Sequence, residues 1–246
     1  YMFIMMNAAR LSVGLEGYAV AERAYQQAAE WGRTRIQGKP PVASPDGKPM
    51  PIAHHPDVKR MLLTMRSQVE AMRALGLYAA LQLDLGAAHP DAALRAAAKA
   101  RGELLIPIVK GWSTETGVEL ASLGIQVHGG MGFIEETGAA QVLRDARITT
   151  IYEGTTAIQS NDLIGRKLAR DRGVTITALL AEVETELKAL PAGAAAREAT
   201  LEALGAMRDA TQSLLAAMAS DPARGAAVSV PYLKLCGLVL GGWLMA

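Results

Sequence analysis

Gly124-Ile-Gln-Val-His-Gly-Gly-Met-Gly-Phe133 lies near the middle of the chain, and Leu143-Arg-Asp-Ala-Arg147 and Ile151-Tyr-Glu-Gly-Thr-Thr-Ala-Ile-Gln159 follow it. The glycines predict a tight turn at which the backbone can approach a phosphate closely. One acid, Glu153, stands just before an expected helix start. Because the flanking sequence favours helix, these runs indicate turns and a short helix inserted between long helices.

The composition favours an all-α fold. Alanine and leucine dominate, aromatic residues make up 4%, and β-branched residues rarely alternate with polar ones. With 246 residues, 50% of them hydrophobic, the chain can bury one large core or two small ones. The formal charge of +1 gives no electrostatic reason to expect a nucleic acid or an anionic membrane as a partner. The lone cysteine excludes an intramolecular disulfide, and the 4 histidines lack metal-ligand spacing, so we expect no metal site.

Helical periodicity predicts an up-and-down four-helix bundle in the first part of the chain. The first three helices are expected at 7–33, 56–85 and 90–124, and residues 155–170 are expected to complete the bundle. Asn7 is the expected N-cap of the first, and residues 36–55, rich in proline, are expected to form a loop or short hairpin. The third helix is expected to bend or break near Pro107 and to end at Gly124 as its cap.

The pattern changes after a break at Arg170-Asp-Arg-Gly173. Three more helices are expected, at 175–190, 193–219 and 226–246. The last has the roughly 20 residues of a membrane span, but Lys234 near its centre and Pro231 favour a buried helix. We therefore divide the chain into a helical domain, residues 1–173, and a helical extension, residues 174–246, that is incomplete.

Taken alone, Glu153 has a structural interpretation. A carboxylate ahead of Thr155 and Thr156 complements the dipole of the helix that they start. An isolated Glu-Gly-Thr would favour that role. The longer run around it favours catalysis instead.

In order and spacing the three runs closely resemble the acyl-CoA dehydrogenases, flavin enzymes that remove two hydrogens from an acyl-CoA thioester. The resemblance covers roughly residues 3–170 as the C-terminal helical domain of that family. Residues after Val174 resemble the extension of its larger members, the branch that includes 3-methylmercaptopropionyl-CoA dehydrogenases. The resemblance implies FAD as cofactor and an acyl-CoA as substrate. The family's N-terminal helical domain and β-domain have no counterpart here, which implies a fragment that is inactive by itself.

The resemblance also implies roles for individual residues. Glu153 is the implied base that takes the proton from the carbon alpha to the thioester, and Ala9 stands where some relatives place that base instead. The implied substrate-binding residues are Asn7, Arg10 and Gly154. The implied FAD-binding residues, some of them reaching a neighbouring subunit's FAD, are Arg35, Gln37, Gln126, His128, Gly129, Gly130, Thr155 and Thr156.

Two of these residues have structural alternatives, and one segment departs from the family. Arg10 can serve as an ion-pair residue between helices, and a lone histidine such as His128 is more often a structural hydrogen-bonding group. Gln37 is followed by Gly38 where the family has an aromatic residue, and residues 44–51 lengthen the following loop.

The resemblance further implies a homo-oligomer, a dimer or tetramer, electron-transfer flavoprotein as electron acceptor, and a bacterial cytoplasmic location. Two alternatives stay open. An acyl-CoA oxidase shares these motifs and differs in how oxygen reaches the reduced flavin. A non-catalytic helical oligomerisation module would have kept only the fold.

Overall fold

The computed structural model describes residues 2–41 and 47–246, with side chains from residue 5 onward. Over these residues the chain is helical, and the only pairing of extended backbone is one isolated antiparallel bridge between Ile36 and Pro51. The all-α prediction is confirmed.

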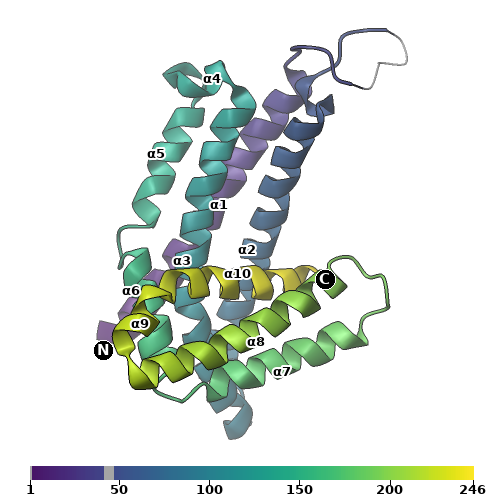
Figure 1. Ribbon diagram of the computed structural model, residues 1–246. Helices are drawn as coiled ribbons and strands as arrows, with labels where there is room; N and C mark the ends of the chain where they lie inside the picture. Colours follow the sequence, from purple (N-terminus) through teal and green to yellow (C-terminus); the bar gives the residue numbers. More distant parts are fainter. Residues whose placement is uncertain (1, 42–46) are drawn as a thin grey trace.

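Four helices form an up-and-down bundle (Figure 1). They are α1 (Met2–Thr34), α2 (Pro56–Ala88), α3 (Ala92–His128) and α5 (Ala139–Thr149). The short α4 (Gly130–Phe133) and the 3-10 turn η2 (Glu135–Thr137) connect α3 to α5. The predicted four-helix bundle is confirmed, with α5 as its fourth helix in place of the expected residues 155–170. α3 is its central helix, because its contacts with the other helices are the most extensive.

Glycines bring α1 and α3 into close contact. A Cβ atom on Gly17 would lie 2.9 Å from the backbone of Ser113, and one on Gly117 would lie 2.7 Å from the carbonyl oxygen of Gly17. Glycine inside a helix costs about 0.5–1 kcal/mol relative to alanine. The helix contact, rather than local helix propensity, therefore requires glycine at these positions.

We expect Gly117→Ala to destabilise the protein by about 1–3 kcal/mol, because the added methyl group meets backbone that cannot rotate away. Urea denaturation followed by circular dichroism measures the change. Gly205→Ala is the matched control, because Gly205 lies in α8 (Arg197–Ser220) with no atom near its would-be Cβ. The control should be neutral or slightly stabilising. Equal stabilities for the two variants would contradict the close approach.

Two details of the predicted helices are wrong: α1 runs through Asn7 instead of starting there, and α3 continues past Gly124. Near Pro107 the predicted break is absent, because α3 is one helix through that residue. Pro107 is buried inside α3, where packing on neighbouring helices compensates for the lost hydrogen bond. Gly124 keeps a negative φ and lies against Ala24 of α1, so it serves helix packing and not a cap. Gly129, with φ 64°, ends the helix.

The loop between α1 and α2 is closed at its base. The backbone N–H of Ile52 donates to the carbonyl oxygen of Arg35 at 2.8 Å, which completes a short hairpin-like closure, and the 3-10 turn η1 (Ile52–His54) follows. His55 contacts the carbonyl oxygen of Gln37 through Nε2 at 3.0 Å. Residues 42–46, which include the first part of the lengthened segment, lie outside the described residues.

The rest of the chain lies across the lower half of the bundle (Figure 1). It comprises α6 (Thr156–Asn161), the π-helical turn η3 (Asp162–Leu168), α7 (Val174–Ala189), α8, α9 (Pro222–Ala227) and α10 (Ser229–Met245). The predicted last helix begins late, because Asp221 caps the separate helix α9 by accepting from the N–H groups of Ala223 and Arg224. Among the described residues, none of the helices combines the length and hydropathy that crossing a bilayer requires.

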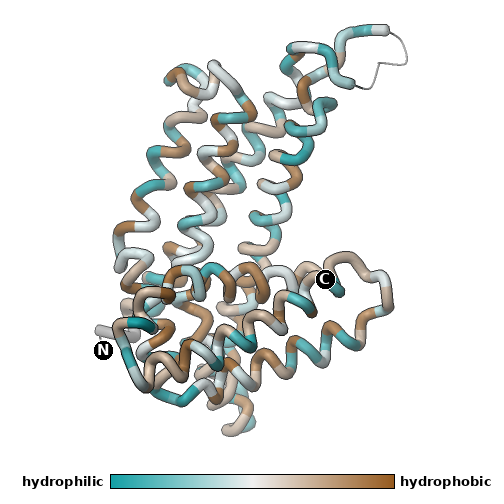
Figure 2. The backbone as a smooth tube through the Cα atoms, viewed as in Figure 1, coloured by the Kyte–Doolittle hydropathy of each residue, from teal (hydrophilic) through white to brown (hydrophobic). Residues whose placement is uncertain are grey.

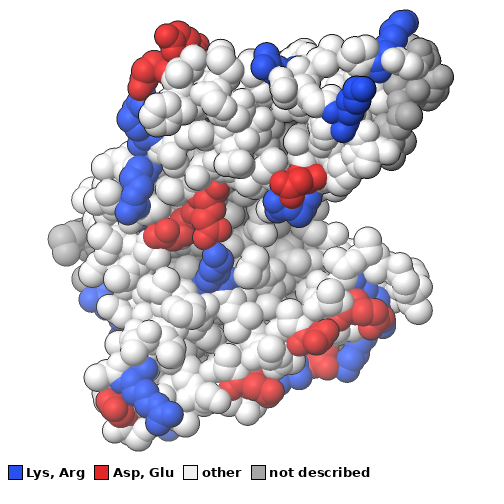
Figure 3. Space-filling view, turned by 45° about the horizontal axis from the view of Figure 1, so that its top comes forward, with Lys and Arg blue, Asp and Glu red and all other residues white. Residues whose placement is uncertain are grey.

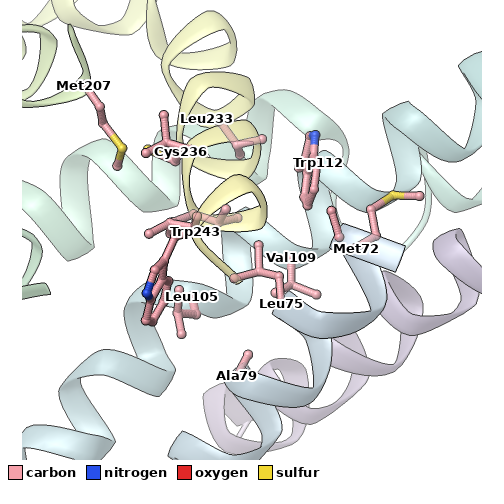
Figure 4. Packing of buried hydrophobic residues seen from close by; sticks show 14 of the residues in the cluster. Met72, Leu75, Ala79, Leu105, Val109, Trp112, Met207, Leu233, Cys236 and Trp243 are labelled. Atoms are coloured by element: carbon pink, nitrogen blue, oxygen red, sulfur yellow. The ribbon is translucent and has the colours of Figure 1, made fainter. Parts of the chain in front are cut away.

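The helix α10 joins the two parts through one continuous hydrophobic core (Figure 4). Leu233 and Trp243 of α10 pack toward α3 and α2, and Cys236 lies toward Met207 of α8. A Cβ on Gly237 would lie 2.2 Å from Trp112 of α3. Burial raises the pKa of the Cys236 thiol to about 12, as expected of a small buried hydrophobic residue. Hydrophobic residues recur along α7 and α10 in Figure 2, as this packing requires.

Charged side chains are mixed on the face drawn in Figure 3. Acidic and basic groups lie interspersed there, between wide uncharged areas. An acidic group left of centre adjoins basic side chains, so neither sign dominates that face, in keeping with the formal charge of +1.

Candidate active site

Glu153 and Gly154 form a left-handed turn between α5 and α6. Their φ angles are 54° and 94°, and a positive φ is uncommon for glutamate. A Cβ on Gly154 would lie 2.9 Å from Nε2 of Gln159 and 3.1 Å from Ile158, so glycine is needed there for both conformation and space. The helix α6 begins at Thr156, which confirms the predicted position of Glu153 just before a helix start.

Two side chains bind the carbonyl groups of this turn. Nζ of Lys110, on α3, donates to the carbonyl oxygen of Gly154 at 2.7 Å. Nε2 of Gln159, on α6, donates to the carbonyl oxygens of Glu153 and Gly154 at 3.2 and 3.1 Å. The turn is therefore held from two different helices.

Contacts on either side of the turn attach it to α1 and α3. The hydroxyl of Thr156 donates to the carboxylate of Glu115 on α3, and the hydroxyl of Tyr152 donates to the carboxylate of Glu16 on α1. Burial, followed by the hydrogen bond to Glu16, raises the pKa of Tyr152 to about 12. Thr156 is buried and Thr155 is exposed.

Arg10 forms a buried ion pair with Asp162 of η3, with Nη1 and Oδ2 3.0 Å apart. The ion-pair alternative for Arg10 is thus observed. Its Nε is buried and has no hydrogen-bond partner among the described residues. Asn7 and Arg10 both line a cavity of about 710 Å³ between α1, α3 and η3. Asp162 therefore engages Nη1 of Arg10, while Nε makes no hydrogen bond among the described residues.

The remaining predicted residues gather at the upper end of the bundle. His128 stacks on Trp31 with ring centroids 5.2 Å apart, and the guanidinium carbon of Arg35 lies 5.8 Å from the centre of the Trp31 ring. Nδ1 of His128 contacts the carbonyl oxygen of Gly124 at 2.7 Å, which is the structural role open to a lone histidine. The predicted residues exposed around this stack are Arg35, Gln37, Gln126, Gly129 and Gly130.

The predicted residues therefore form two groups. Glu153, Gly154, Thr155 and Thr156 adjoin α3 near its middle, whereas the Trp31 and His128 stack lies at the upper ends of α1 and α3 (Figure 1). Arg10 belongs with the first group, because both Arg10 and Glu153 affect the pKa of Lys110.

The sequence did not predict four residues that the structure places in these two groups. They are Trp31, Lys110, Glu115 and Asp162. Lys110 does carry a signal, since it interrupts the apolar run 104–112 of a helix and must be buried if that run is. Asp162 carries none, because its partner Arg10 lies far away in the sequence.

The fold and the site together are a helical bundle with a Glu-Gly turn beside its central helix. The chain belongs to the acyl-CoA dehydrogenase family. The family described as "Acyl-CoA dehydrogenase, C-terminal domain" matches residues 2–169, and "Acetyl-CoA dehydrogenase C-terminal like" matches residues 178–246. The chain is similar to the 3-methylmercaptopropionyl-CoA dehydrogenase of Ruegeria pomeroyi, with 51% identity over 99% of this chain and 42% of that protein. The family resemblance is confirmed.

Two solved structures share the fold. Caenorhabditis elegans ACDH-11 in complex with C11-CoA has a TM-score of 0.77 at 21% identity, over 98% of this chain and 39% of its own. The acyl-CoA dehydrogenase of Bacillus anthracis complexed with FAD has a TM-score of 0.73 at 19% identity, over 98% of this chain and 41% of its own. The chain thus spans about two fifths of the length of these proteins.

Proposed function

We propose that this chain is the C-terminal part of a FAD-dependent acyl-CoA dehydrogenase that introduces a double bond between the α and β carbons of an acyl-CoA thioester. Residues 1–173 form its helical domain and residues 174–246 its extension. The observation that carries the proposal is the left-handed Glu153–Gly154 turn, built beside the central helix of a chain of this family.

In this function Glu153 removes the proton from the α carbon. A carboxylate is a weak base for such a proton, so the turn must hold it against the substrate and the backbone N–H of Glu153 must stabilise the enolate oxygen. Asn7, Arg10 and Gly154 bind the substrate, the first two from the cavity that they line. FAD, when bound, accepts the hydride that leaves the β carbon.

The residues at the upper end fit part of FAD. Arg35 is exposed and carries the positive charge that a phosphate requires, and Gln37 and Gln126 offer amides around it. No atom lies within 4 Å of a would-be Cβ on Gly129 or Gly130, so a ligand can approach this backbone. His128 supports the site through its contact with Gly124.

Thr155 and Thr156 complete the proposed FAD contacts beside Glu153. Because these threonines lie beside the middle of α3 and the upper group lies at the end of the bundle, we infer that Arg35 and Gly129–Gly130 serve the FAD of a neighbouring copy. The function therefore includes a homo-oligomer, a dimer or tetramer. Electron-transfer flavoprotein is the proposed electron acceptor, and the bacterial cytoplasm is the proposed location, as befits the bacterial relative.

The experiment mixes the full-length protein, loaded with FAD, with saturated acyl-CoA thioesters in the absence of oxygen. A panel of chain lengths with 3-methylmercaptopropionyl-CoA included is appropriate, because the Ruegeria pomeroyi relative is named for that substrate. We expect bleaching of the oxidised flavin and a product lighter by two hydrogens. An FAD-loaded protein that no thioester bleaches would contradict the proposal. Oxygen is then admitted to the reduced protein. Rapid reoxidation of the flavin with release of peroxide would favour the oxidase alternative.

A further inference from the structure

Lys110 is a fully buried lysine that the proposed reaction does not use. Its side chain lies inside the bundle on α3 with no exposed surface. Ammonium groups are rarely buried without a compensating partner, because they lose their hydration. The partner here is the carbonyl oxygen of Gly154, 2.7 Å from Nζ.

The turn that Lys110 binds needs support. Glu153 and Gly154 both have positive φ angles, 54° and 94°, and a non-glycine residue keeps such an angle only where its surroundings enforce it. Gln159 supplies two of the contacts to the carbonyl groups, and Lys110 supplies the one that comes from the opposite helix. The side chains of Lys110 and Gln159 both bind backbone carbonyl groups, so they fix the conformation of the turn. Neither of these hydrogen bonds uses the carboxylate of Glu153.

Burial and three charged groups set the pKa of Lys110. Burial, the largest effect, and Arg10 on α1 lower its pKa, while Glu115 on α3 and Glu153 in the turn raise it, with a net lowering to about 8. Arg10 is itself paired with Asp162, and Glu115 accepts from Thr156. Lys110 is therefore cationic at neutral pH and loses its charge, and with it the charge-assisted hydrogen bond, as the pH rises through 8.

We propose that Lys110 is a positioning residue that holds the Glu153–Gly154 turn in the shape required for proton abstraction. The role rests on the proposed function of Glu153. It does not make Lys110 a catalytic residue, because its hydrogen bond is to backbone.

The test uses the full-length FAD-loaded protein and hydrogen–deuterium exchange of the segment 148–159. Lys110→Met keeps the length of the side chain and removes the donor, so we expect exchange in this segment to rise about tenfold. Lys99→Met, on an exposed position of the same helix, is the matched control and should leave exchange unchanged. The difference between the parent and Lys110→Met should shrink from pH 7 to pH 9.5, as the parent loses the charge.

Flavin reduction by acyl-CoA provides the second readout. In Lys110→Met it should slow by a similar factor with little change in substrate binding, and the parent rate should fall above pH 8 while the variant rate does not. Unchanged exchange in a folded, FAD-loaded Lys110→Met would overturn the proposal, whatever its activity. If that variant does not fold, Lys110→Gln keeps a neutral donor and is subjected to the same comparison. Faster exchange with an unchanged reduction rate would mean that the turn is held by Lys110 but that Glu153 is not the base.

Discussion

Glu153→Gln lowers the rate of flavin reduction by acyl-CoA by about 10²–10⁴-fold in the full-length enzyme, the range expected for loss of a general base. The amide keeps the size of the side chain and can accept hydrogen bonds, but it cannot take the α proton. Only the transition state therefore loses a partner, and binding of FAD and substrate should stay close to that of the parent. Anaerobic stopped-flow absorbance measures the rate, and spectral titration measures binding.

The matched control is Glu136→Gln. Glu136 is exposed and lies in η2, near the glycine turn and away from Glu153. The Glu136→Gln variant loses the same charge as Glu153→Gln but leaves the Glu153–Gly154 turn unchanged. Its rate of flavin reduction should therefore equal that of the parent. A near-parent rate in Glu153→Gln would place the base elsewhere.

The second large effect is on stability. Asp162→Asn should destabilise the protein by about 3–5 kcal/mol, because it leaves the guanidinium of Arg10 buried without its counter-charge. The side chains of Arg10 and Asp162 are only 8% and 7% exposed. Urea denaturation should show a lower midpoint with little change in slope.

Two comparisons separate this effect from general sensitivity to mutation. Asp57→Asn breaks a pair with Arg60 whose side chains are 71% and 62% exposed, and should cost no more than about 1 kcal/mol. Replacing both buried partners, Arg10→Met with Asp162→Leu, should recover most of the lost stability, because neither buried charge remains; Arg166, which also pairs with Asp162, is largely exposed. A loss below about 1 kcal/mol in Asp162→Asn would show that Arg10 finds other partners or water.

The sequence by itself determined the features that depend on neighbouring residues. The all-helical class follows from composition and periodicity. Asp91 begins α3 by capping the N–H groups of Ala93 and Leu94, and Gly173, with φ 78°, marks the break before α7. The turn before Thr156 follows from Gly154, and the order of the motifs was sufficient to indicate the family.

Only the tertiary structure decided the features that join residues far apart in the chain. Pro107 and Gly124 have the local character of helix breaks, yet α3 continues through both because packing against α1 and α10 outweighs one missing hydrogen bond and one flexible residue. The pairing of Arg10 with Asp162 and of Lys110 with Gly154 likewise arises when α1, η3 and the turn meet at α3. Burial then gives these pairs their energetic weight, since a charge removed from water depends on the partner that the fold provides.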